Sequence, residues 1–144
     1  MTLGADEVDL LRRSFQAATR DMPDLVDLFY RRLFEIAPET RLLFRGDMAL
    51  QGEKLKSTLG MMIAQIQDIA MLHPMLADLA RRHVRYGVVP RHYALVGEAL
   101  LLAVRRTLGD GFDDRTEGVW RAAYQGIAEA MIAAAHDGQA SRVA

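Results

Sequence analysis

Apolar side chains recur every three or four residues along most of this 144-residue chain, the spacing that places them on one face of an α-helix. The alternation of apolar and polar residues that is typical of strands is missing, and so are Asn-Gly hairpin turns. The pattern therefore predicts an all-α protein. About seven helices of unequal length favour an irregularly crossed arrangement over an up-and-down bundle of four long helices.

Prolines, glycines and aspartates predict where these helices begin and end. The expected helices are one that carries Val8 and fades at residues 20–21, one from Pro23 with Asp21 as a cap, a short one from Pro38, and longer ones from about Met48, Pro74, Pro90 and Asp113 or Asp114. The helix from Met48 is expected to continue through Ile66 to Ile69. Gly97 lies inside the helix from Pro90 at a cost of about 1 kcal/mol relative to alanine, which indicates a close contact with another helix.

Composition limits the classes of function. We expect one domain over residues 1–144, with a frayed tail at 137–144. A net charge of −1 gives no case for binding nucleic acid, and zero cysteines exclude thiolate metal sites and cysteine catalysis. The N-terminus does not resemble a signal peptide, and no apolar run reaches the roughly twenty residues of a membrane span, so we expect a cytoplasmic protein without a membrane partner.

His83 is the first candidate for chemistry, because it continues the apolar stripe of Leu76 and Leu79 just before the corner at Gly87. One interpretation is a buried histidine that is hydrogen-bonded to its own helix. The other is a ligand. No HxxxH or HxxE pair includes His83, which argues against zinc, but one imidazole suffices when a macrocycle supplies the other metal ligands, as in haem. The second ring nitrogen would then need a partner, and the carbonyl of Leu79 is within reach.

Other candidates are ambiguous when each is taken alone. Tyr30 is typical of an amphipathic aromatic side chain whose hydroxyl reaches water, and Gln51 of an exposed helix residue. Phe44 and Tyr93 are typical of packing residues. His92 has no apolar stripe around it.

The order of these residues resembles that of the globin family, specifically the single-domain bacterial globins related to the haem domain of flavohaemoglobins. Four blocks carry the resemblance: FYRRLF from Phe29, PETRLLF ending at Phe44, RRHVRYGVVPRHYALVGEALL from Arg81, and LGDGF followed by VWRAAY between Leu108 and Tyr124. The third block is the most specific. The resemblance implies a globin fold of about seven helices around a pocket for haem b (iron protoporphyrin IX).

The resemblance also implies roles for individual residues. His83 is similar to the axial iron ligand, and Phe44 to the phenylalanine that wedges the haem. Tyr30 and Gln51 match the distal hydrogen-bond donors, and Tyr93 matches a tyrosine beside the axial histidine. The remaining pocket residues are expected to be Leu55, Met62, Leu79 and Val96.

One position departs from the family pattern. A glutamate of the last helix usually joins the tyrosine beside the axial histidine, and here that position is Ala135. Without a carboxylate near His83, electron donation from its imidazole should be weaker.

The resemblance implies reversible binding of dioxygen, with NO and CO as further ligands, in a monomer or homodimer. Nitric oxide dioxygenation would be a secondary activity; we expect no reductase domain after Ala144, so this activity would need a separate reductase. The alternatives are a haem-based gas sensor, an electron-transfer globin without turnover, and an interaction module that binds no haem.

Overall fold

The computed structural model describes residues 3–20, 22–44, 46–67 and 69–143, with the backbone alone at 22–24, 69 and 137–143. The described residues form helices joined by short turns, and they contain no strand. In chain order these are α1 (Ala5–Thr19), α2 (Met22–Ile36), the 3-10 helix η1 (Pro38–Leu43), α3 (Met48–Ala64), α4 (Ile69–Tyr86), α5 (Pro90–Leu108), the 3-10 helix η2 (Gly109–Gly111) and α6 (Asp114–Val143). The predicted all-α class is therefore confirmed.

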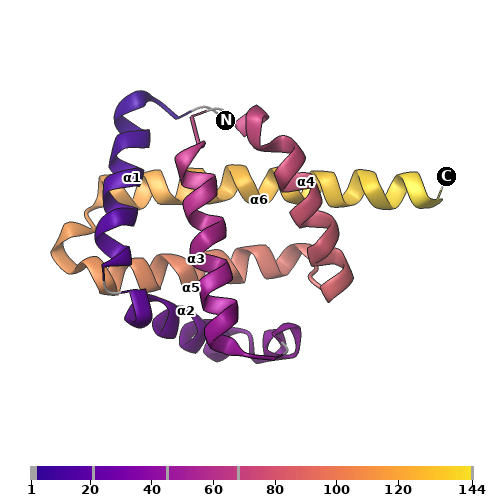
Figure 1. The fold of residues 1–144 in the computed structure, drawn as a ribbon, viewed down its shortest axis with the longest axis horizontal. Coiled ribbons are helices and arrows are strands. Elements are labelled where there is room, and N and C mark those ends of the chain that lie inside the picture. Colours follow the sequence, from indigo (N-terminus) through magenta and orange to yellow (C-terminus); the bar gives the residue numbers. More distant parts are fainter. Residues whose placement is uncertain (1–2, 21, 45, 68, 144) are drawn as a thin grey trace.

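The helices cross one another at steep angles. In Figure 1, α5 and α6 run antiparallel, and α1, α3 and α4 lie across them. The most extensive packing is of α2 against α5 and of α4 against α6. This is the irregularly crossed arrangement expected from helices of unequal length, and it leaves space between α3, α4 and α5 that side chains must line or fill.

Most helix starts agree with the sequence signals. Asp47 caps α3 by accepting hydrogen bonds from the backbone N–H groups of Ala49 and Leu50. Asp113 caps α6 in the same way, since it accepts from the N–H of Thr116. The predicted cap Asp21 lies outside the described residues.

The corner between α3 and α4 differs from the prediction. Helix α3 ends at Ala64 instead of continuing to Ile69, and α4 begins at Ile69, five residues before the proline expected to open it. The side chain of Arg12 explains the early end of α3. Its guanidinium donates to the carbonyl oxygens of Ile63 and Ala64, at 3.3 and 2.6 Å, and so satisfies acceptors that a helix end exposes.

Pro74 lies inside α4, where the helix lacks the hydrogen bond that a backbone N–H would make. Leu72 and Leu76 lie on either side of it and are 2% and 0% exposed, so both are packed into the core. Burial of these two leucines stabilises the helix on both sides of the proline.

The last helix is longer than the sequence predicted. Helix α6 continues to Val143, across the residues expected to form a frayed tail.

No single helix in the described part of the chain is long and apolar enough to cross a membrane. One pair of segments, Ala70–Tyr86 and Pro90–Gly111, is together long and apolar enough for a span by length and composition alone. The two segments are bent by 106° relative to each other.

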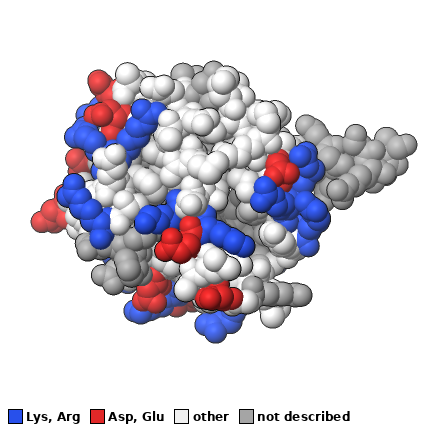
Figure 2. Space-filling model, viewed as in Figure 1, with Lys and Arg blue, Asp and Glu red and all other residues white. Residues whose placement is uncertain are grey.

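Surface charges of both signs are mixed. The face shown in Figure 2 has no continuous basic area among the described residues. Near the end of α4, the positive charges of Arg81 and Arg82 are partly neutralised, because both side chains form ion pairs with Asp78.

Candidate functional site

A cavity of about 570 Å³ lies between the crossed helices. Its size is within the range of small-molecule and cofactor sites. Side chains from α2, η1, α3, α4, α5 and α6 line it, and most of its wall is apolar. The cavity brings together every residue that the sequence analysis assigned to a haem site: Tyr30, Phe44, Gln51, Leu55, Met62, Leu79, His83, Tyr93 and Val96. None of the described lining residues is an aspartate or a glutamate.

His83 projects from the last turn of α4 into this cavity. Its Nδ1 lies 2.7 Å from the carbonyl oxygen of Leu79, the partner expected from the sequence. Because a carbonyl can only accept, Nδ1 carries the proton and Nε2 of the neutral ring keeps its lone pair. Burial lowers the pKa of His83, against the opposing effect of the Leu79 carbonyl. The ring is therefore held as an oriented neutral base.

Tyr93 lies beside His83, at the start of α5. The two rings are stacked, with centroids 6.2 Å apart and planes inclined by 18°. Burial raises the pKa of Tyr93, so its hydroxyl stays protonated near neutral pH. This contact fixes the orientation of the imidazole from one side.

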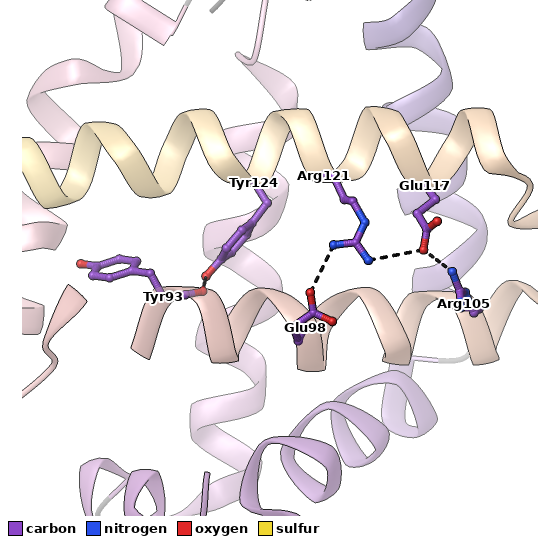
Figure 3. A network of polar contacts seen from close by, with 6 residues as sticks. All are labelled: Tyr93, Glu98, Arg105, Glu117, Arg121 and Tyr124. Atoms are coloured by element: carbon purple, nitrogen blue, oxygen red, sulfur yellow. Dashed lines mark hydrogen bonds and ion pairs between the residues drawn. The ribbon is translucent and has the colours of Figure 1, made fainter. Parts of the chain in front are cut away.

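Tyr124 of α6 reaches across to the start of α5 at Tyr93 (Figure 3). Its hydroxyl donates a hydrogen bond to the backbone carbonyl of Tyr93. A Cβ atom on Gly97 would lie 2.5 Å from Cε1 of Tyr124, so only glycine lets the ring approach α5 this closely. The close helix contact predicted at Gly97 is thereby confirmed. The surface beyond Tyr124 carries an ion-pair chain between the two helices, in which Glu98, Arg121, Glu117 and Arg105 alternate (Figure 3).

No described carboxylate lies in the wall around His83. Ala135 is half-buried in α6, and the glutamate one to two turns earlier, Glu129, is exposed. The only described hydrogen-bond partner of the His83 ring is the Leu79 carbonyl. The departure noted in the sequence therefore extends to the structure: a neutral backbone oxygen, and not an anion, polarises this imidazole.

Tyr30 lies on the opposite wall within an aromatic cluster. Its ring packs against Phe29, Phe34 and Phe44, with centroids 5.0, 6.0 and 5.2 Å away. Tyr30 is 8% exposed, so the interpretation of an ordinary water-facing tyrosine is wrong for this side chain. Burial raises the pKa of Tyr30 to about 12, and the hydroxyl remains a proton donor. No described residue hydrogen-bonds to it.

Gln51 lines the same wall from the first turn of α3, where it is half-buried. The next residue, Gly52, is buried, and a Cβ there would lie 2.7 Å from Cγ1 of Val26. This close approach holds the start of α3 against α2 and so fixes the backbone that carries Gln51. Leu55, one turn further along, adds an apolar side chain to the wall.

His92 is a lining residue that the sequence analysis did not select. It is 6% exposed, and its Nδ1 accepts a hydrogen bond from the N–H of Val89, 3.1 Å away. Its Nε2 is the one buried side-chain nitrogen or oxygen in the described part of the chain without a hydrogen-bond partner. The signal that could have identified it is positional, since it is the third residue of a helix opened by Pro90, where a side chain caps the helix start.

Comparison with known proteins identifies the class of fold. The sequence profile of the globin family matches residues 27–131, which is more than half of the chain. The chain belongs to the globin family. The described residues contain no cluster of three or more histidines, cysteines, aspartates or glutamates that could hold a metal by themselves. Membership of this family implies haem binding.

Two curated relatives with similar sequences are flavohemoproteins. The chain is 34% identical over 107 residues to a flavohemoprotein of Bordetella parapertussis, which covers 72% of this chain and 27% of the relative. It is 34% identical over 114 residues to a flavohemoprotein of Pseudomonas aeruginosa, covering 76% of this chain and 29% of the relative. The chain thus spans less than a third of the length of these curated relatives.

Solved structures give the same result. An engineered carbene transferase derived from a proposed nitric oxide dioxygenase of Rhodothermus marinus has a TM-score of 0.85 at 29% identity, covering 99% of this chain and 100% of that one. A bacterial globin from Campylobacter jejuni has a TM-score of 0.80 at 25% identity, covering 93% and 97%. The predicted globin fold is therefore confirmed.

Proposed function

We propose that this protein binds haem b and uses it for reversible binding of dioxygen. One geometric observation carries the proposal: His83 points its Nε2 lone pair into an apolar cavity, and Tyr30, whose side chain is buried, lines the opposite wall. The residues present suit the cofactor. The cavity is large and mostly apolar, and it offers one fixed imidazole and one buried, unpaired donor, His92.

The residues divide the work between holding the cofactor and stabilising its ligand. His83 would serve as the axial ligand, oriented by the Leu79 carbonyl and by the Tyr93 ring. Phe44, Leu55, Met62 and Val96 would exclude water from the faces of the macrocycle. When bound, the haem iron supplies reversible coordination of dioxygen and other diatomic gases.

Tyr30 and Gln51 would stabilise a polar ligand on the distal side. A hydrogen bond from a donor in a dry site to an oxygen that carries partial negative charge is stronger than one in water. Tyr30 can supply such a bond at any pH below its raised pKa of about 12. Its surrounding phenylalanines keep the hydroxyl from being drawn to solvent.

The hydrogen bonding of His83 favours reversible binding of dioxygen over rapid oxidation of nitric oxide. Strong electron donation from an axial imidazole needs a carboxylate partner for its second nitrogen, and the described partner is a neutral carbonyl. A secondary activity, the oxidation of nitric oxide to nitrate by dioxygen, is supported by the similarity to a proposed nitric oxide dioxygenase. It would require electrons from a reductase, which is the partner we propose for this globin domain.

Optical spectra test the main proposal. Purified protein supplemented with haem should show a Soret band in the ferric, ferrous and oxygenated forms, and the last form should revert when oxygen is removed. The absence of a Soret band after supplementation would refute haem binding. In resonance Raman spectra, the iron–histidine stretch of the ferrous protein should lie in the range of neutral imidazole; a frequency typical of imidazolate would contradict the argument about His83.

Steady-state turnover separates the secondary activity. With a flavodoxin or ferredoxin reductase, NADH and nitric oxide, an NADH-coupled rate above that of free haem would support dioxygenation. A rate no faster than free haem would remove the enzyme from the proposal and leave the oxygen-binding, sensing and electron-transfer interpretations.

A further inference from the structure

His92 carries a hydrogen-bond donor for which the described protein offers no acceptor. His92 is only 6% exposed, and it lines the cavity from the first turn of α5. Its Nε2 has no hydrogen-bond partner. A buried polar group without a partner destabilises the fold, and such a group usually marks a ligand, an ion or a water.

The other nitrogen of this ring shows which kind of group is missing. The N–H of Val89 donates to Nδ1, so Nδ1 must hold a lone pair. In a neutral imidazole the proton is then on Nε2. What the structure lacks at this nitrogen is therefore an acceptor, and a donor or an apolar edge would leave the N–H unpaired.

A tetrapyrrole offers few acceptors. Its pyrrole nitrogens are occupied by the metal, and its methyl and vinyl groups are apolar. The two propionate carboxylates at one edge are the acceptors that remain. A carboxylate is also the acceptor that forms the strongest hydrogen bond with an N–H donor.

We propose that the Nε2–H of His92 is a buried anchor for one carboxylate of the tetrapyrrole, and that this bond sets how long the protein retains its cofactor. The inference rests on the proposed function, because it assigns a role towards the same haem. It adds a binding residue on α5 that is distinct from the axial ligand on α4.

Two cations also line the cavity and offer a competing site for the carboxylates. Lys54 and Arg85 are both exposed, so an ion pair with either one is screened by water and salt. A bond from His92 lies inside the fold, where it is screened much less. The two arrangements therefore differ in their dependence on ionic strength.

The experiment compares two substitutions, each of which keeps the hydrogen-bonding function of one of the two imidazole nitrogens. In His92→Asn the side-chain oxygen takes the place of Nδ1 and still accepts from Val89, but the donor into the cavity is lost. In His92→Gln the amide N–H₂ takes the place of Nε2 and the donor is kept. Each variant is loaded with haem, and the rate of haem transfer to excess apomyoglobin is measured at low and high salt.

We expect His92→Asn to release haem about ten-fold to a hundred-fold faster than the unsubstituted protein, as for the loss of one charge-assisted hydrogen bond. His92→Gln should stay close to the unsubstituted rate. The difference between the two variants should persist at high salt. Thermal unfolding of the apoproteins by circular dichroism checks that both variants fold.

A second arm leaves the protein unchanged and alters the cofactor instead. The dimethyl ester of haem has no carboxylate, so the unsubstituted protein should release it faster than haem, and His92→Asn should add little further acceleration. Equal release of haem from His92→Asn and the unsubstituted protein would overturn the inference. So would an ester effect that is reproduced by Lys54→Gln with Arg85→Gln and not by His92→Asn. If no variant and not even the unsubstituted protein binds haem, the proposed function has failed, which is a distinguishable result.

Discussion

The two walls of the cavity use their polar groups in opposite ways. On the wall of α4 and α5, Nδ1 of His83 is bonded to the Leu79 carbonyl, and the hydroxyl of Tyr124 is bonded to the Tyr93 carbonyl. On the wall of α2 and α3, no described residue bonds to the hydroxyl of Tyr30. The first wall therefore orients its chemistry with internal hydrogen bonds, whereas the second keeps a donor free for a ligand.

This contrast has an energetic cause. A donor in an aromatic cluster would be costly to bury if it had to remain unpaired, but the cavity at its tip gives it a partner when a ligand is bound. Nδ1 of His83 and the hydroxyl of Tyr124 are paired in the empty cavity and carry no such cost, whereas Nε2 of His92 on α5 does. Ligand affinity should consequently depend most on the free donor, and cofactor retention on the oriented wall.

The largest expected effect comes from removing His83. His83→Ala should lose its haem during gel filtration and show no Soret band in the protein peak, because it lacks the proposed axial nitrogen. Added imidazole should restore part of the absorbance. His73→Ala is the matched control, since His73 is exposed on the same helix outside the cavity, and it should retain haem. Retention of haem by both variants would mean that His83 is not the axial ligand.

Tyr30→Phe should remove the free donor and leave the aromatic packing in place. The oxygen complex should lose roughly 1–3 kcal/mol, mostly as faster dissociation, which stopped-flow mixing with dithionite measures. Tyr86→Phe removes a hydroxyl from a side chain that is 63% exposed and should leave the rate near its original value. An unchanged rate in Tyr30→Phe would mean that its hydroxyl does not reach the ligand.

Gly97→Ala tests the support of the oriented wall. The new Cβ would overlap the Tyr124 ring, and overpacking of this kind costs about 1–3 kcal/mol, partly offset by the better helix propensity of alanine. Gly118→Ala is the opposite case in α6, because nothing lies within 4 Å of its Cβ position. Urea unfolding should show Gly97→Ala destabilised by about 1–2 kcal/mol and Gly118→Ala stabilised by up to about 1 kcal/mol. Equal effects at both sites would show that the contact with Tyr124 relaxes freely.

Gln51→Leu should give the smallest change. Gln51 lines the cavity but is only half-buried, so water competes for its hydrogen bonds, and oxygen dissociation should accelerate by only a few-fold, or about 0.5–1 kcal/mol. The same stopped-flow measurement applies. A larger effect than that of Tyr30→Phe would reverse the ranking of the two distal donors.

The sequence predicted the features that are encoded within a few residues. Helix starts at Pro38 and Pro90, the cap at Asp113 and the hydrogen bond from His83 to the carbonyl four residues earlier all depend on local spacing. The close contact at Gly97 was also predicted, because an uncompensated glycine inside a helix costs stability unless another element needs the space.

The features that were missed depend on distant partners. The end of α3 at Ala64 is set by Arg12, fifty-two residues away in the sequence. Pro74 could lie inside α4 because burial of Leu72 and Leu76 offsets a lost backbone hydrogen bond. His92 shows no periodic pattern that predicts burial, and only the packing of α5 against its neighbours places it inside the fold.

The attachment of α3 at both ends has a consequence for ligand traffic. Gly52 holds its first turn against Val26, and Arg12 holds its last carbonyls. A helix tethered in this way cannot swing outward without breaking one of these contacts. Diatomic gases should therefore reach the distal wall when side chains such as Gln51 and Lys54 rotate, which takes picoseconds to nanoseconds. The rate of gas uptake should then be limited by diffusion and by these side-chain rotations, and not by slower movement of the backbone.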